Sequence, residues 1–187
     1  MEYALLWPHG SQITKIEFSY TSKIRSSERP KITSPHDADQ LFRRYWNHIR
    51  IRQREEFKCI YLNQDYRVLA ISEVGLGNEK AVLVKDKLML SIAYQVSAAS
   101  IILCHNHPSG DLVPSNADKS FTRRLLYAAE IMEFRILDHI ILSPYYRYYS
   151  FMANGLIPCN KNLRYSQKSK EELAKPLYRD SLIRKAV

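Results

Sequence analysis

Glycine and cysteine are scarce in this 187-residue chain, and long apolar runs are missing. Five glycines exclude collagen-like and other glycine-rich architectures. Three widely spaced cysteines, Cys59, Cys104 and Cys159, provide neither a disulfide framework nor a C-x-x-C zinc knuckle. The N-terminus lacks the basic start and apolar run of a secretory signal, and no stretch approaches the roughly 18 apolar residues that span a bilayer. We therefore expect a soluble, reduced, cytoplasmic protein with no membrane partner.

Basic residues and tyrosines are abundant instead. The chain has 28 Lys and Arg against 19 Asp and Glu, which gives a net charge of +9, and it has 13 tyrosines. A charge of this sign favours contact with nucleic acid or another polyanion. Hydrophobic residues make up 45% of the chain, which is enough for a packed core.

Composition divides the chain into three segments. Residues 1–53 form a polar N-terminal extension, residues 54–157 form the main domain, and residues 158–187 form a basic tail. The last 27 residues contain eight Lys or Arg and three acidic residues, a net charge of +5. Such a tail is typical either of a solvated segment or of a contact with nucleic acid or a partner.

Strand-like and helix-like patterns alternate along the chain. In the extension, residues 13–20 alternate like a strand, and residues 37–49 form a predicted helix with Leu41, Tyr45 and Ile49 on its apolar face. The main domain is predicted to contain a hairpin over 57–74, helices over 84–96 and 115–132, and strands over 100–104, 134–142 and 148–151. Strands that alternate with helices favour an α/β sandwich over a helical bundle.

Two histidines and one aspartate follow the buried strand over 100–104. His105 and His107 are one residue apart, so both imidazoles lie on the same side of an extended chain. Asp118 lies in the first turn of the next helix, which has Ser115 as its expected N-cap. Two histidines and a carboxylate are a ligand set of catalytic zinc, with a fourth position open to water. Each feature alone is common in metal-free proteins, but their combination favours a metal site.

This segment resembles the metal motif of the JAMM (MPN+) metalloproteases, and the string HNHPSG with PS-x-x-D resembles their RadC branch. Further matching segments are Arg54-Glu55-Glu56-Phe57, Leu137-Asp138-His139-Ile140-Ile141, and Ser150-Phe151 with Gly155. The resemblance covers residues 54–157. It implies a three-layer α-β-α sandwich of the JAMM/deaminase-like type with a mixed sheet.

The resemblance also implies roles for individual residues. His105, His107 and Asp118 match the ligands of Zn2+, and Ser115 matches the serine that stabilises the tetrahedral oxyanion. Glu55 is the best match to the catalytic glutamate. Glu56 is the alternative, because adjacent strand residues face opposite ways and only one can reach the metal. The implied activity is hydrolysis of an amide bond in a peptide or protein substrate.

Several neighbouring residues have structural interpretations. Cys104 is predicted to be a buried thiol on the face opposite His105. Asp111 is interpreted as a turn residue, and His139 as a hydrogen-bonded core histidine. The tyrosines among residues 145–149 are expected either to stack on bases or to pack along a turn and a strand.

Two classes of function follow. The first is a RadC-like zinc peptidase or isopeptidase, associated through that resemblance with DNA repair. The second is a nucleic-acid-associated accessory protein with a structural or inactive metal site, in which the charge of +9 provides the binding. A metal-dependent nuclease is disfavoured, because two histidines and one aspartate lack the carboxylate cluster of two-metal phosphoryl chemistry.

Overall fold

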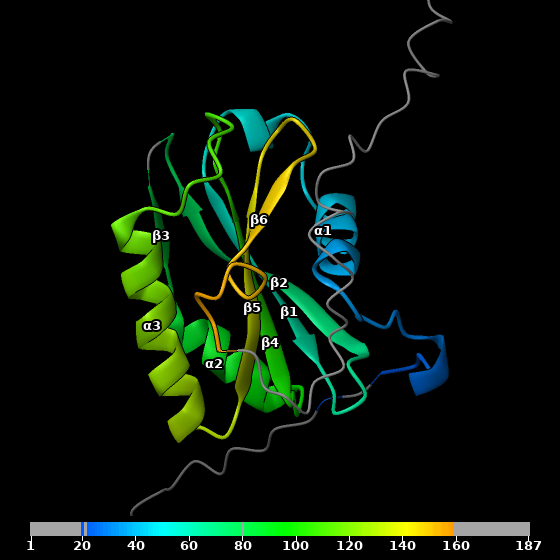
Figure 1. The fold of residues 1–187 in the computed structure, drawn as a ribbon. Coiled ribbons are helices and arrows are strands. Elements are labelled where there is room, and N and C mark those ends of the chain that lie inside the picture. Colours follow the sequence, from blue (N-terminus) through cyan, green and yellow to red (C-terminus); the bar gives the residue numbers. More distant parts are fainter. Residues whose placement is uncertain (1–19, 21, 80, 159–187) are drawn as a thin grey trace, which may run out of the picture.

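A mixed sheet of six strands, in the order β3-β2-β1-β4-β5-β6, runs through the computed structural model, which describes residues 20, 22–79 and 81–158 (Figure 1). The strands are β1 (Glu56–Leu62), β2 (Val68–Gly77), β3 (Val82–Val84), β4 (Ser100–Asn106), β5 (Arg135–Leu142) and β6 (Tyr148–Ser150). Neighbouring strands are antiparallel except β4 and β5, which are parallel. A parallel pair needs a long crossover, and the helix between these two strands provides it.

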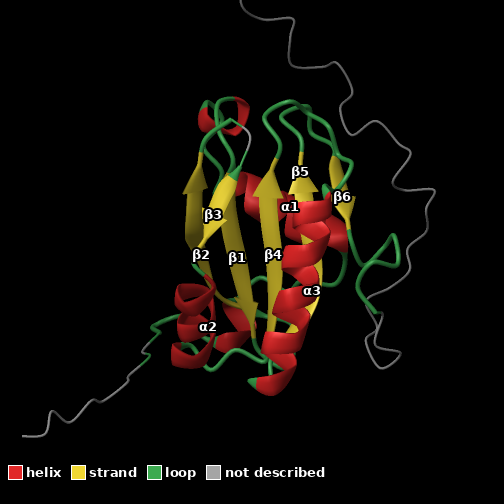
Figure 2. Ribbon diagram, turned by 90° about the vertical axis from the view of Figure 1, so that its left-hand side faces the viewer, coloured by secondary structure: helices red, strands yellow, loops and turns green. Residues whose placement is uncertain are grey.

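Helices cover both faces of this sheet. Helix α1 (Pro35–Arg44) lies on one face, and α2 (Asp86–Gln95) and α3 (Asn116–Ile131) lie on the other (Figures 1 and 2). Two short 3-10 helices, η1 (Ser26–Glu28) and η2 (Arg50–Arg52), flank α1 in the chain. The architecture is therefore the predicted three-layer α-β-α sandwich with a mixed sheet.

Alternation along the central strands divides the core into two hydrophobic clusters. The cluster under α2 and α3 takes Cys59, Tyr61, Ile101 and Leu103 from β1 and β4. The cluster under α1 takes Ile60, Leu62, Ile102 and Cys104. Both strands are buried along their whole length because helices cover both faces. The prediction that Cys104 is a buried thiol facing away from the histidines is confirmed.

Helix α1 ends earlier than predicted. It stops at Arg44 rather than Ile49, because the Asn47 side chain accepts hydrogen bonds from the N–H groups of Ile49 and Arg50, both at 2.9 Å, and directs the chain into η2. Tyr45 and Ile49, which we expected on the apolar face, are 60% and 69% exposed. Leu41 is buried as predicted, and Phe42 and Trp46, whose spacing also widens the apolar face, are buried with Ala38.

The helix predicted over 84–96 begins two residues later, at Asp86. Val84 belongs to β3, which pairs with an extension of β2 beyond the predicted end of the hairpin. Leu88 is 42% exposed, and Met89 and Ala93 are the buried residues of α2. A three-residue strand is too short to show a periodicity of its own, so pairing with β2 decides its conformation.

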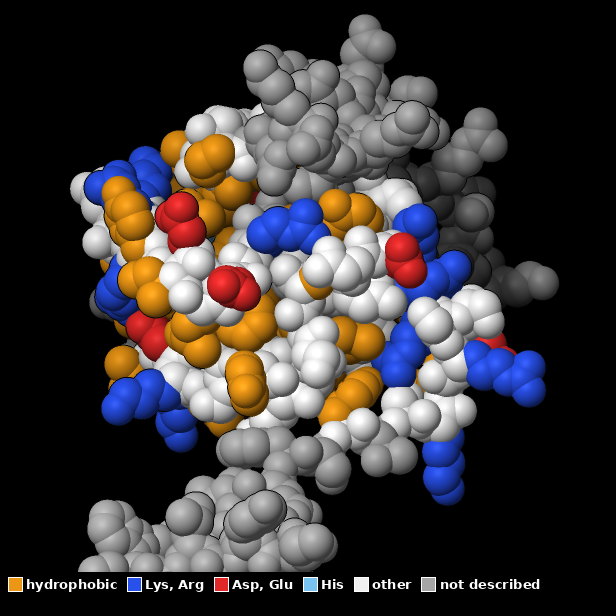
Figure 3. Space-filling view, turned by 90° about the horizontal axis from the view of Figure 1, so that it is seen from below, with side chains coloured by type: hydrophobic (Ala, Val, Ile, Leu, Met, Phe, Trp, Pro, Cys, Tyr) orange, Lys and Arg blue, Asp and Glu red, His pale blue; other side chains and the backbone are white. Residues whose placement is uncertain are grey.

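The remaining predicted elements agree with the structure to within about two residues at each end. Apart from Tyr20, the strand predicted over 13–20 lies outside the described residues, as does the chain after residue 158. None of the helices among the described residues has the length and apolar character needed to cross a membrane. The end of the molecule seen in Figure 3 carries scattered apolar side chains between charged ones, and no histidine is visible there among the described residues.

Candidate metal centre

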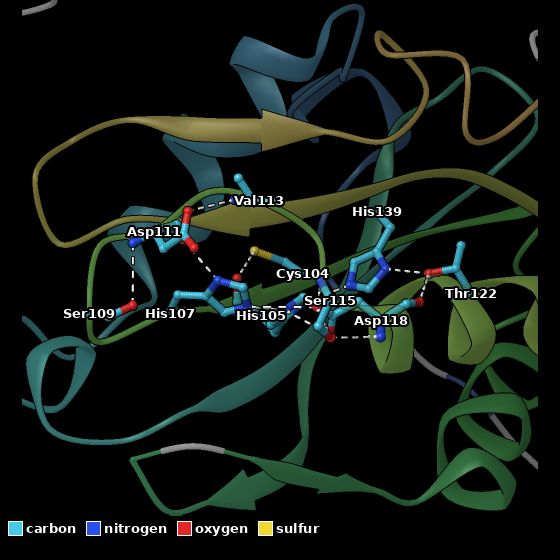
Figure 4. Close-up of polar contacts among 10 residues, drawn as sticks. All are labelled: Cys104, His105, His107, Ser109, Asp111, Val113, Ser115, Asp118, Thr122 and His139. Carbon is cyan, nitrogen blue, oxygen red and sulfur yellow. Dashed lines mark hydrogen bonds and ion pairs between the residues drawn. The ribbon is translucent and has the colours of Figure 1, made fainter.

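The two histidines at the end of β4 face helix α3 (Figure 4). His105 lies opposite Phe57 of β1, and the two rings are stacked with their centroids 5.9 Å apart. Asp118, in the first turn of α3, lies beside both histidines. The ligand atoms of His105, His107 and Asp118 all lie within 4.8 Å of one another. The fold thus brings together the three residues that the motif singles out.

The ligand atoms lie close enough to share one ion. His105 Nε2 lies 3.0 Å from His107 Nε2 and 3.3 Å from Asp118 Oδ1, and His107 Nε2 lies 3.8 Å from Asp118 Oδ2. The side chain of His105 is 2% exposed, whereas those of His107 and Asp118 are 14% and 19% exposed. The cluster is therefore closed on the side of the core and open to solvent on the other, as a site for substrate requires.

A hydrogen bond to the backbone sets the tautomer of His107. Its Nδ1 lies 2.8 Å from the carbonyl oxygen of Asp111. A carbonyl oxygen can only accept, so Nδ1 carries a proton, and in the neutral ring Nε2 presents a lone pair. This lone pair faces the carboxylate of Asp118, and two such groups repel each other unless a cation lies between them. Nitrogen and oxygen donors in this arrangement fit Zn2+.

The turn that supplies this carbonyl agrees with the interpretation of Asp111 as a turn residue. The Asp111 carboxylate accepts a hydrogen bond from the N–H of Val113 at 2.9 Å, which closes the turn. The side chain of Asp111 is thus occupied locally, while its carbonyl oxygen orients His107.

Ser115 and Asp118 form a capping box at the start of α3. Ser115 Oγ accepts from the N–H of Asp118 at 3.1 Å and donates to Asp118 Oδ2 at 2.6 Å, and the N–H of Ser115 donates to the same oxygen at 2.8 Å. Burial raises the pKa of Asp118, but the neighbouring His105 and the hydrogen bonds from Ser115 outweigh it and hold the pKa well below its usual range. Asp118 is therefore ionised at neutral pH, as a metal ligand must be.

The two candidate glutamates lie on opposite faces of the sheet. Glu55 is extended against the end of β2, where its N–H donates to the carbonyl of Asn78 at 2.8 Å and its carbonyl accepts from Gly77 at 2.9 Å. Its half-buried carboxyl is close enough to His107 and Asp118 for their charges to act on it. Burial raises the pKa of Glu55, His107 lowers it and Asp118 raises it.

Glu56 points away from the histidines and is fully buried. Its carboxylate lies 3.1 Å from Arg50, 3.6 Å from Arg54 and 3.1 Å from Lys58. These cations hold Glu56 in an ion-pair network on the α1 side of the sheet. Of the two glutamates, only Glu55 lies on the side of the candidate metal centre.

Asn106, between the two histidines, joins the ends of β4 and β1. Its carboxamide oxygen accepts from the N–H of Glu56 at 2.8 Å, and its amide group donates to the carbonyl oxygens of Ile51 and Arg54, both at 2.9 Å. The side chain is fully buried. We assigned no role to Asn106 from the sequence, although strand alternation places it on the face opposite the histidines.

His139 is the hydrogen-bonded core histidine that the sequence predicts, and it is fully buried. Its Nε2 lies 2.8 Å from His105 Nδ1, and its Nδ1 lies 2.7 Å from Thr122 Oγ1. Burial and the neighbouring His105 lower its pKa well below the usual value. Thr122 has no motif that marks it in the sequence, although its position one helical turn after Asp118 places both on the same face of α3.

Comparison with known proteins places this site in a family. Residues 32–156 match the family described as the RadC-like JAB domain. A UPF0758 protein of Flavobacterium johnsoniae is 36% identical over 126 residues, which are 67% of this chain and 53% of that protein. The UPF0758 protein YfjY of Escherichia coli is 39% identical over 105 residues, or 56% of this chain and 65% of that protein. This chain spans about half the length of most of the curated relatives it matches.

Proposed function

Because this chain belongs to the family of RadC-like JAB domains, we propose that it is a zinc-dependent hydrolase that cleaves an amide bond in a peptide or protein. One observation carries the proposal: the ligand atoms of His105, His107 and Asp118 lie within 4.8 Å of one another, at an edge of the site that solvent reaches. Glu55 lies on the same face of the sheet, so a carboxylate is available for proton transfer.

In this proposal His105, His107 and Asp118 hold Zn2+, which, when bound, supplies a Lewis acid that activates water and polarises a carbonyl group. Glu55 takes a proton from the attacking water, whose oxygen forms a bond to the carbonyl carbon of the substrate. Glu55 then passes the proton to the leaving amine as the carbon–nitrogen bond breaks. The raised pKa of Glu55 suits both steps, because a general base and acid works best with a pKa nearer to the working pH.

Ser115 is exposed beside this cluster, and its hydroxyl group has one proton to donate. In the structure, the Ser115 hydroxyl donates this proton to Asp118 Oδ2. We propose that the hydroxyl rotates to the substrate when a carbonyl oxygen becomes negatively charged, and that Ser115 then stabilises the oxyanion. The N–H of Ser115 keeps Asp118 Oδ2 in place during this rotation.

Metal content and peptide cleavage, measured on the same preparations, test this function. We expect about one zinc per chain in the wild type and in Glu55→Gln, and loss of zinc in His107→Ala and Asp118→Ala. Of these four proteins, only the wild type should cleave a mixture of internally quenched peptides. Glu79→Gln, at an exposed glutamate in the turn after β2, is the matched control and should retain both properties. Cleavage by Glu55→Gln would remove Glu55 from its role, and a wild type without zinc would refute the proposed chemistry.

A second candidate function, binding of single-stranded nucleic acid, is favoured by a surface of arginine and tyrosine beside the site. Tyr145 and Tyr146 are 59% and 54% exposed. The guanidinium groups of Arg52 and Arg43 lie 5.6 Å and 5.3 Å from the centres of these two rings, respectively. Exposed aromatic rings stack on bases, and arginines bind phosphates.

Salt dependence distinguishes this second function from the first. Binding of a labelled oligonucleotide, followed by fluorescence anisotropy, should weaken steeply between about 50 and 200 mM salt and should be insensitive to a chelator. Arg52→Ala and Tyr146→Ala should weaken it further, with the zinc content unchanged. Binding that is equally strong in these variants would exclude this surface.

A further inference from the structure

We infer that His139 and Thr122 are positioning residues, which act through a buried chain of hydrogen bonds to keep the proton of His105 on Nδ1 and its Nε2 free for a metal ion. The inference rests on the metal site of the proposed function. It explains what orients His105, a proposed ligand whose ring, among the described residues, bonds no backbone carbonyl directly.

The chain of hydrogen bonds runs through three elements (Figure 4). His105 Nδ1 on β4 lies 2.8 Å from His139 Nε2 on β5. His139 Nδ1 lies 2.7 Å from Thr122 Oγ1 on α3, and Thr122 Oγ1 lies 2.7 Å from the carbonyl oxygen of Asp118 on the same helix. His105, His139 and Thr122 are at most 2% exposed, so water does not compete for these groups.

The last bond sets the direction of all the others. The Asp118 carbonyl oxygen can only accept, so Thr122 donates its single hydroxyl proton to it. Thr122 Oγ1 must then accept from His139, which places the proton of that ring on Nδ1. A buried imidazole without a carboxylate partner is neutral, so His139 Nε2 presents a lone pair. That lone pair accepts the proton of His105 Nδ1.

The opposite direction is disfavoured at the Thr122 end of the hydrogen-bond chain. If Thr122 donated to His139, its oxygen and the Asp118 carbonyl oxygen would lie 2.7 Å apart with no proton between them. His139 would then donate to His105, and the proton of His105 would move to Nε2. A protonated Nε2 cannot bind a metal ion.

The Nδ1 protons of the two histidines are therefore held by different partners. His107, at the more exposed edge, donates its Nδ1 proton directly to the backbone carbonyl of Asp111. His105 is buried and uses His139 and Thr122 to reach a backbone carbonyl that belongs to Asp118, another proposed ligand. The hydrogen-bond chain thus links two proposed ligands, His105 on β4 and Asp118 on α3, through the core. Partners of this kind orient the ring and make it a better ligand.

Thr122→Val tests the inference, because valine has nearly the same shape but no hydroxyl group. The proton of His139 should move to Nε2, and the proton of His105 should follow to its own Nε2. The affinity for zinc alone, measured by competition with a chelating dye, should fall about 10- to 100-fold. Thr122→Ser keeps the hydroxyl and should keep the affinity near that of the wild type. Tyr61→Phe removes a hydroxyl that bonds Ser72 at 3.0 Å within the sheet, and should leave the affinity unchanged.

Nitrogen NMR of the metal-free protein provides the readout that is independent of zinc. We expect His105 to be protonated on Nδ1 in the wild type and in Thr122→Ser, and on Nε2 in Thr122→Val, with circular dichroism showing that all three are folded. A wild-type His105 protonated on Nε2, or a Thr122→Val protein with an unchanged tautomer and zinc affinity, would overturn the inference. If the wild type binds no zinc, the proposed function fails, while the tautomer of His105 still decides on the hydrogen-bond chain.

Discussion

Replacement of Asn106 by alanine should destabilise the protein and disturb the position of Glu55 without removing a proposed metal ligand. The side chain makes three hydrogen bonds of 2.8 to 2.9 Å to backbone groups on the two sides of the β1 start. Alanine would leave the N–H of Glu56 and the carbonyls of Ile51 and Arg54 without this partner. The segment that carries Glu55 would then be attached to β4 only by strand pairing that begins at Phe57.

The magnitude follows from burial. A buried polar group that loses its partner costs about 1–3 kcal/mol, and three such groups set a range of about 3–9 kcal/mol. We expect a water molecule to enter the polar space left by the carboxamide and to recover part of this loss, so the free energy of unfolding should decrease by about 3 kcal/mol. Asn47→Ala is the matched control: Asn47 also bonds two backbone N–H groups, at 2.9 Å, but it is exposed. Its loss should cost about 1 kcal/mol or less.

Urea unfolding of both variants, followed by circular dichroism, measures the two values side by side. Zinc content should be unchanged in Asn106→Ala, while peptide cleavage should fall because Glu55 is less well placed. If Asn106→Ala is no less stable than Asn47→Ala, the carboxamide does not hold the two strand ends together and the reasoning is refuted.

Two further predictions concern backbone strain and buried charge. Gly110 has a φ of +84°, and a Cβ there would lie 2.5 Å from Tyr145 Cε2, so Gly110→Ala should cost at least about 1–3 kcal/mol in urea unfolding; an unchanged stability would contradict this. Burial raises the pKa of Asp138 to about 7, so its stabilising contribution is complete below the unfolded pKa of about 4 and is lost as the pH rises through 7. Asp138→Asn should therefore gain roughly 1 kcal/mol over the wild type per pH unit across this range; parallel stability profiles of the two proteins would contradict the raised pKa.

The order of secondary structure was largely predictable, because strands and helices of this length show their own periodicity. The predictions failed where a neighbouring strand or a single side-chain hydrogen bond, rather than the periodicity of the segment itself, sets the conformation. Val82–Val84 is a strand because β2 lies beside it. Tyr45 and Ile49 are exposed because the helix ends before them, where the side chain of Asn47 bonds the backbone, although the apolar spacing continues to Ile49.

Some features of the candidate site were also predictable from local spacing, and others depend on tertiary contacts. The sequence by itself determined that His105 and His107 share a side and that Ser115 and Asp118 form a helix start, because these relations depend on two- and three-residue spacings. Only the tertiary structure decided that Glu55 rather than Glu56 faces the histidines, since this depends on the register of β1 against β4. Contacts between distant residues also decided the partners of Asn106 and the link from His105 to His139. Local spacing follows from backbone geometry, whereas these contacts follow from how the sheet and helices pack.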